Sequence, residues 1–124
     1  MTRGIYINMK KRNLKIFVSY TRLDNIVHMD FLIKLNNFLK TFSHPFIDLI
    51  HNNSLEKQMR IEKEISIADY LILLRTHSTF DSQWVQKELS IAKEMDIPIL
   101  EFDYNELLIS NFNLIKKEIF QYCI

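Results

Sequence analysis

The chain alternates short β-rich runs with stretches of helical periodicity. The segment Lys15–Tyr20 (KIFVSY) is rich in β-branched and aromatic residues and predicts a buried strand. Similar runs predict a second strand at Pro45–Ile50, a third at Tyr70–Arg75 and a fourth at Ile97–Phe102. The third run, YLILLR, is the most hydrophobic of the four, so we expect it at the centre of a sheet.

Between these runs, apolar residues recur every three or four positions, which predicts helices with one buried face. Asp24 can cap the first helix, and Asn53 with Glu56 matches a capping box for the second. Leu107 to Tyr122 is the final predicted helix. The positions expected to face the core are Val27, Phe31, Leu35, Phe38, Leu55, Ile61, Ile65, Ala68, Val85, Leu89, Ala92, Phe112, Ile115, Ile119 and Tyr122.

This alternation of strand and helix implies a mainly parallel sheet with helices on both faces, joined by right-handed crossovers. We therefore expect a flavodoxin-like, three-layer α/β/α fold of four or five strands, with residues 104–109 as the place for a fifth. Small doubly wound sheets commonly have the strand order 2-1-3-4-5 and bind ligands beyond the carboxyl ends of strands one and three. The site is thus expected just after Tyr20 and just after Arg75.

Length and composition narrow the classes of function. The 124 residues suffice for one core, and we divide them into a basic lead-in, residues 1–13, and a single domain, residues 14–124. The only glycine is Gly4, which excludes glycine-rich phosphate-binding loops. A net charge of +1 gives no general attraction for nucleic acid. One cysteine, Cys123, allows neither an internal disulfide nor a thiolate zinc site, and we expect no bound metal.

The start of the chain does not have the pattern of a signal peptide, because charges interrupt it before any apolar run of the needed length. The longest apolar stretch, Tyr70 to Leu74, is far too short to span a bilayer. We therefore expect a cytoplasmic protein with no membrane partner.

The main chemical candidates are Trp84 and Glu88, which lie four positions apart and so share one face of a predicted helix. A carboxylate there suits the oxocarbenium-like state of a sugar that loses its leaving group, and the indole suits stacking on a base. Arg22, across the crevice, suits a phosphate. Structural roles also fit: Trp84 as a packing anchor, Glu88 as a solvated charge, and Ser19 as a partner of backbone groups at a strand end.

Five segments in the expected order resemble a TIR domain, the fold of Toll and interleukin-1 receptor tails and of many bacterial NAD-cleaving proteins. The resemblance covers roughly residues 14 to 103, and the helix segment carries the Trp-x-x-x-Glu pattern of the NAD-cleaving members. The segments are KIFVSYTRLD at 15–24, PFID at 45–48, SIADYLILLRTHS at 66–78, SQWVQKELSIA at 82–92 and IPIL at 97–100.

The resemblance implies an NAD+ nucleosidase that cuts the nicotinamide–ribose bond and yields nicotinamide with ADP-ribose or a cyclic or modified ADP-ribose. NAD is then a substrate, and no cofactor is implied. Glu88 would be the catalytic residue, with substrate-binding roles for Trp84, Arg22, Tyr20, Ser19, His51 and Asn53. The resemblance also implies antiphage defence, self-association through TIR–TIR contacts and a separate effector or sensor protein.

Two other functions fit the same residues. One is a non-enzymatic TIR interaction module, and the other is an enzyme similar to nucleoside deoxyribosyltransferases, which have a related fold. The chain also departs from the family pattern after its second strand, where the loop HNNSLEKQ has neither the usual glycine nor a Pro-Gly pair. This departure leaves the mode of assembly and the substrate contacts of His51, Asn52 and Asn53 open.

Overall fold

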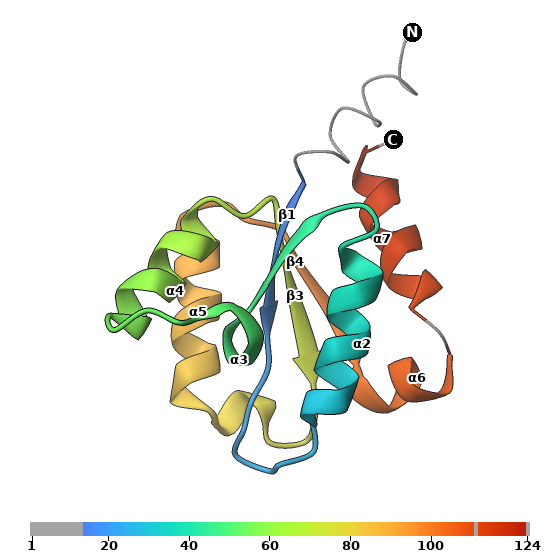
Figure 1. Ribbon diagram of the computed structural model, residues 1–124, viewed down its shortest axis with the longest axis horizontal. Helices are drawn as coiled ribbons and strands as arrows, with labels where there is room; N and C mark the ends of the chain where they lie inside the picture. The colour runs from blue at the N-terminus through green and yellow to red at the C-terminus, as the bar shows by residue number, and fades with distance from the viewer. Residues whose placement is uncertain (1–13, 111, 124) are drawn as a thin grey trace, which may run out of the picture.

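Four parallel strands form the middle layer of the domain (Figure 1). The computed structural model describes residues 14–110 and 112–123, so the predicted basic lead-in, residues 1–13, lies outside the described residues. Within the described chain the strand order is β2-β1-β3-β4, which confirms the predicted order as far as four strands. The strands are β1 (Lys15–Ser19), β2 (His44–Ile47), β3 (Tyr70–Arg75) and β4 (Ile99–Asp103).

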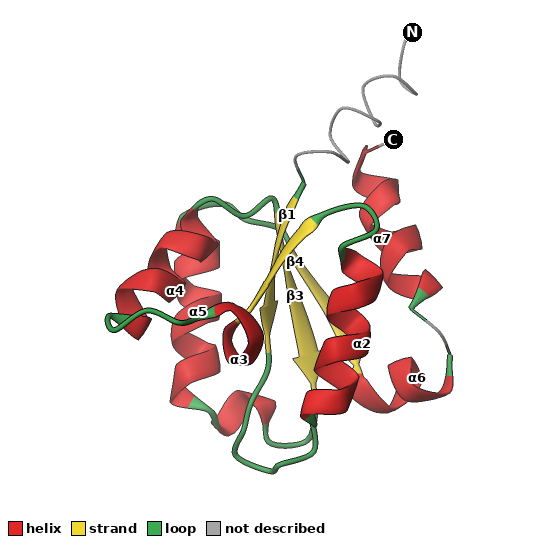
Figure 2. Ribbon diagram, in the orientation of Figure 1, coloured by secondary structure: helices red, strands yellow, loops and turns green. Residues whose placement is uncertain are grey.

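Helices cover both faces of this sheet (Figures 1 and 2). One face carries α2 (Met29–Leu39), α6 (Tyr104–Ile109) and α7 (Asn113–Cys123). The other carries α4 (Lys57–Ser66) and α5 (Gln83–Glu94). The one-turn helix α3 (Asp48–His51) follows β2, and a 3-10 turn, η1 (Thr79–Asp81), leads into α5. The three-layer α/β/α arrangement predicted from the alternation of elements is confirmed.

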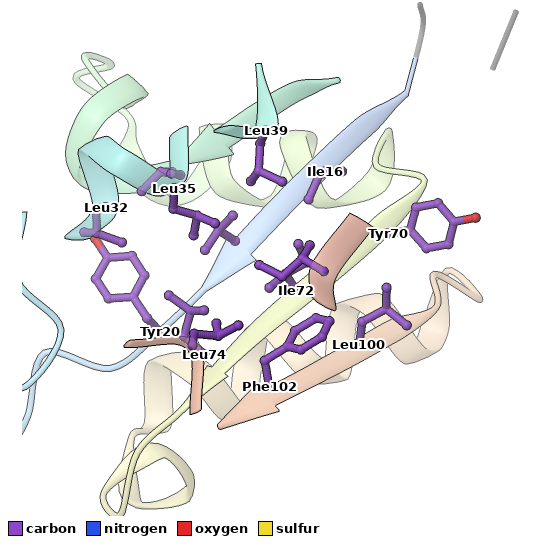
Figure 3. Packing of buried hydrophobic residues seen from close by; sticks show 14 of the residues in the cluster. Ile16, Tyr20, Leu32, Leu35, Leu39, Tyr70, Ile72, Leu74, Leu100 and Phe102 are labelled. Atoms are coloured by element: carbon purple, nitrogen blue, oxygen red, sulfur yellow. The ribbon is translucent and has the colours of Figure 1, made fainter. Parts of the chain in front are cut away.

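The sheet separates two hydrophobic clusters because successive side chains of a strand point to opposite faces. Ile16 and Ile72 pack toward α2, where Leu35 is fully buried (Figure 3). Phe17 and Leu71 pack on the opposite side, toward α4 and α5. A strand covered on both faces has no reason to alternate apolar with polar residues, which explains the continuous apolar run of β3.

Two predicted strands differ from the structure. The run 45–50 is strand only to Ile47, because Asp48 to His51 turn into α3. The proposed fifth strand at 104–109 is wrong: these residues form α6. The Asp103 carboxylate caps that helix by accepting the backbone N–H of Glu106 at 3.1 Å, so a local hydrogen bond selects helix over strand. The predicted single helix 107–122 is likewise two helices, α6 and α7.

The predicted helix caps also fail. The carboxylate of Asp24 accepts the Ile26 N–H and the Thr76 hydroxyl instead of capping α2, which begins at Met29 without a side-chain cap. Helix α4 likewise begins at Lys57 without a side-chain cap, so Asn53 and Glu56 form no capping box. Because α4 starts late, Leu55 precedes it and is fully exposed, contrary to its predicted burial.

Among the described residues, no helix is long and apolar enough to cross a membrane. The same residues contain no group of three or more His, Cys, Asp or Glu side chains arranged to hold a metal ion.

Candidate active site

A pocket of about 520 Å³ opens at the carboxyl ends of β1 and β2, on the face of the sheet covered by α4 and α5. Four chain segments build it: the end of β1 with the loop that follows, the turn α3, the start of α4 and the first half of α5. The lining residues are Val18, Tyr20, Thr21, Arg22, Leu23, Asp48, Leu49, Asn52, Lys57, Ser82, Trp84 and Glu88.

Glu88 lies on the buried face of α5, together with Val85 and Ala92. Only 4% of the residue is exposed, and the residue is part of the pocket wall. The hydroxyl of Ser19, at the end of β1, donates a hydrogen bond of 2.7 Å to Glu88 Oε1. A carboxyl group is rarely this buried, so its position calls for a chemical reason.

The burial of Glu88 changes its charge state. Loss of water around the carboxyl raises its pKa from 4.5 to about 8, and the nearby Asp48 carboxylate acts in the same direction. Hydrogen bonds from Ser19 and Trp84 oppose this rise in pKa, because they stabilise the ionised form. Burial therefore favours the protonated form of Glu88 at neutral pH, and a positive charge nearby would favour its ionisation.

Trp84 lies one turn before Glu88 and lines the same pocket with 40% of the residue exposed. The helix that carries both begins at Gln83, and the Ser82 hydroxyl caps it by accepting the Val85 N–H at 3.2 Å. The cap fixes where α5 begins and therefore which residues face the pocket. An accessible indole beside a buried carboxyl suits a flat, cationic ring next to a sugar.

The rim of the pocket carries a polar network. Arg22 Nη2 lies 3.0 Å from Asp48 Oδ2, and the Asn52 amide donates to Asp48 Oδ1 at 2.7 Å. Lys57 Nζ in turn donates to the backbone oxygen of Asn52 at 2.7 Å. Two cations, Arg22 and Lys57, thus line the same pocket as Glu88 and are suited to bind a phosphate-bearing ligand.

The family model for the TIR-like domain of Thoeris protein ThsB matches residues 17–107. The chain belongs to this family. The matched range runs from β1 into α6 and includes every residue that lines the pocket. No curated protein sequence matches the chain.

The structure brings together four of the seven residues predicted for the site of this TIR-like domain. Glu88, Trp84, Arg22 and Tyr20 all line the pocket. The prediction that residues after Tyr20 contribute is therefore consistent with the structure. The residues just after Arg75 do not line the pocket, because the Thr76 hydroxyl is bonded to Asp24 at 2.7 Å and the chain turns into η1.

The other three predicted residues lie elsewhere. Ser19 is behind Glu88, with 1% exposed, and does not line the pocket. His51 turns toward edge strand β2, where its Nδ1 accepts the Ile47 N–H at 2.8 Å and its ring packs on Phe46. Asn53 is exposed and does not line the pocket either, since its neighbour Asn52 occupies the buried position in the turn.

Asp48 and Lys57 are pocket residues that the sequence analysis did not select, and Asn52 is one whose substrate contact it left open. Asp48 was hidden by the prediction that the second strand continues to Ile50. An aspartate directly after a strand of a parallel sheet is a signal that could have found it, because such positions meet at the ligand-binding edge. Lys57 carries no such signal, since only the path of the loop after α3 brings it to the pocket.

Proposed function

We propose that this TIR-like domain is an NAD+ nucleosidase that cleaves the nicotinamide–ribose bond. The observation that carries the proposal is the buried Glu88 carboxyl in a pocket wall beside the accessible indole of Trp84. The nicotinamide ring of NAD+ is flat and positively charged, which suits the indole face. Its positive charge also favours the ionised form of Glu88 by lowering the pKa of that carboxyl.

The reaction follows from these placements. The bond between ribose C1′ and the nicotinamide nitrogen breaks, and its electron pair leaves with neutral nicotinamide. Positive charge then develops on the ribose, where the ionised Glu88 stabilises it. Water attacks C1′ and releases a proton to solvent, which gives ADP-ribose. Attack by a hydroxyl of the same molecule would give a cyclic form instead. Arg22 and Lys57, which line the same pocket, would hold the diphosphate.

The test is incubation of the purified chain with NAD+, with nicotinamide and the ADP-ribose products followed by mass spectrometry. We expect Glu88→Ala to lower the rate at least about 100-fold, because the transition-state charge loses its partner. Glu94→Gln is the matched control, since Glu94 is an exposed carboxylate on the same helix. Equal product formation by the wild type and Glu88→Ala would overturn the proposal. Cleavage of nucleosides in place of NAD+ would favour the deoxyribosyltransferase-like alternative.

Assembly is a second candidate function, either together with catalysis or without it. Exposed apolar side chains support it: Leu55 is fully exposed and Met59 is 66% exposed, both beside the start of α4. Contact with a second copy would remove this apolar surface from water. Light scattering of the wild type against Leu55→Ser with Met59→Ser tests this, and unchanged monomers in both samples would count against assembly.

In the cell, we propose that the product acts as a signal in cytoplasmic antiphage defence and is read by a separate effector protein. Membership of the Thoeris ThsB family supports this setting.

A further inference from the structure

Ser19 lies at the end of β1 and touches the pocket only through Glu88. Its hydroxyl donates to Glu88 Oε1 at 2.7 Å, and both residues are buried. Strand β1 is held on both sides, by β2 and by β3, with Ser19 in register with Leu73. The hydroxyl is therefore attached to a hydrogen-bonded strand inside the sheet, whereas the Glu88 carboxyl sits at the end of a side chain with three rotatable bonds.

We propose that Ser19 is a positioning residue whose hydroxyl holds one oxygen of the Glu88 carboxyl, so that the other oxygen remains available to the substrate. The terminal torsion of a glutamate has a broad energy profile, so packing alone orients the carboxyl poorly. A hydrogen bond from a rigid strand removes that freedom before the substrate arrives. This role differs from the direct substrate contact that the TIR resemblance implied for Ser19, and it rests on the proposed function.

The same contact favours the charged form that the reaction requires. Burial and the Asp48 carboxylate both disfavour ionisation of Glu88, while the Trp84 indole and the Ser19 hydroxyl favour it. Arg22 and Lys57 line the pocket as well, although Arg22 is already paired with Asp48. Removal of the Ser19 hydroxyl therefore takes away one of two hydrogen bonds that oppose the rise in the Glu88 pKa.

The experiment compares the wild type with Ser19→Ala, Ser19→Thr and Ser43→Ala. Threonine keeps the hydroxyl, so Ser19→Thr serves as the rescue variant. Ser43 is the matched control, because it is also a buried serine whose hydroxyl donates a 2.7 Å hydrogen bond, to the backbone oxygen of Leu39 away from the pocket. Two measurements are made: titration of the Glu88 carboxyl by carbon-13 NMR, and kcat and KM for NAD+ across the pH range.

We expect Ser19→Ala to raise the Glu88 pKa by about one unit, since a hydrogen bond to a charged group contributes that much. At neutral pH its kcat should fall about tenfold with KM nearly unchanged, because the lost contact acts in the transition state. Raising the pH should recover part of this loss. Ser19→Thr should titrate close to the wild type, and Ser43→Ala should change neither the titration nor the pH profile.

An unchanged Glu88 titration in Ser19→Ala would overturn the positioning role, as would a kcat for NAD+ equal to that of an active wild type. The NMR arm does not depend on catalysis. If the wild type fails to cleave NAD+, the proposed function fails while the titration still decides whether Ser19 controls the carboxyl. If Ser19→Ala does not fold, the comparison of Ser19→Thr with the wild type decides: a shifted Glu88 pKa in Ser19→Thr would refute the proposal.

Discussion

At the scale of single residues, the stability of the fold and the proposed chemistry place opposite requirements on Glu88. A carboxyl that is 4% exposed gains nothing for the fold by becoming charged. The proposed reaction nevertheless needs the charge. The Ser19 hydroxyl satisfies the buried carboxyl with a hydrogen bond, and under the proposed function a cationic substrate would bring about its ionisation.

This conflict predicts how stability depends on pH. The pKa of Glu88 is about 8 in the folded chain against 4.5 for an unperturbed group, so the folded state binds more protons between those values. The contribution of Glu88 to stability therefore falls as pH rises from about 5 to 8 and levels off above that. Glu88→Gln removes this loss and should be more stable than the wild type at about pH 8, by on the order of 4 kcal/mol.

The measurement is urea unfolding of the wild type and Glu88→Gln at about pH 5 and about pH 8. The advantage of Glu88→Gln should be small at the lower pH and grow with pH. Glu94→Gln, which changes an exposed carboxylate, should show no such growth. A pH-independent difference between the wild type and Glu88→Gln would show that Glu88 is ionised throughout, contrary to the raised pKa.

Among the elements, helix α5 contributes most to the site because it carries both Trp84 and Glu88. Its buried face consists of Val85, Glu88 and Ala92, so the helical spacing that seats the helix on the sheet also places the carboxyl in the pocket wall. The sequence pattern placed Val85 and Ala92 on this face correctly. The pattern predicted no burial for Glu88, because it counts apolar residues and glutamate is polar.

The hydrogen bond that caps the start of α5 predicts that loss of the Ser82 hydroxyl lowers stability. Ser82→Ala removes the hydroxyl that accepts the Val85 N–H at 3.2 Å and should lower the free energy of unfolding by about 1 kcal/mol. It should also lower NAD+ cleavage, since the first turn of the helix carries Trp84. Ser66→Ala, at the exposed end of α4, is the control and should change stability by less than about 0.5 kcal/mol. Equal stability of the two variants in urea would exclude a capping role for Ser82.

At the scale of the whole molecule, the sheet couples the two helical layers and positions the pocket. Ser19 and Glu88 are 69 positions apart, yet they share a hydrogen bond because β1 passes beneath α5. Arg22 and Asp48 are 26 positions apart and meet where β1 and β2 end together. The site therefore exists only when the sheet is formed and α5 is packed on it.

Substitution of Phe17 would test how far the fold depends on packing between the sheet and α4 and α5. Its side chain is 1% exposed, stacks on Phe46 with a centroid distance of 5.6 Å and joins β1 to the cluster under α4 and α5. Phe17→Ala should cost about 3–5 kcal/mol of a total that is about 5–15 kcal/mol for a domain. Phe80→Ala removes a ring from a residue that is 52% exposed and should cost far less. Urea unfolding distinguishes the two, and similar midpoints would contradict the assigned core.

The sequence by itself determined the features that depend on local pattern. Strand runs such as Tyr70–Arg75 were recognisable because burial on both faces makes them continuously apolar. The parallel order followed from alternation of strand and helix. Trp84 and Glu88 were placed on one face because helical spacing alone decides that relation.

Only the tertiary structure decided the burial of Glu88, the pairing of Arg22 with Asp48 and the turn of His51 away from the pocket. The tertiary structure also decided that β2 ends early and that α3 follows it. The β-rich run predicted strand beyond Asp48, but the chain begins a helix there. The physical reason is shared. Each of these features depends on segments that meet through the sheet or on the path of a loop, and local hydrophobic periodicity contains no information about either.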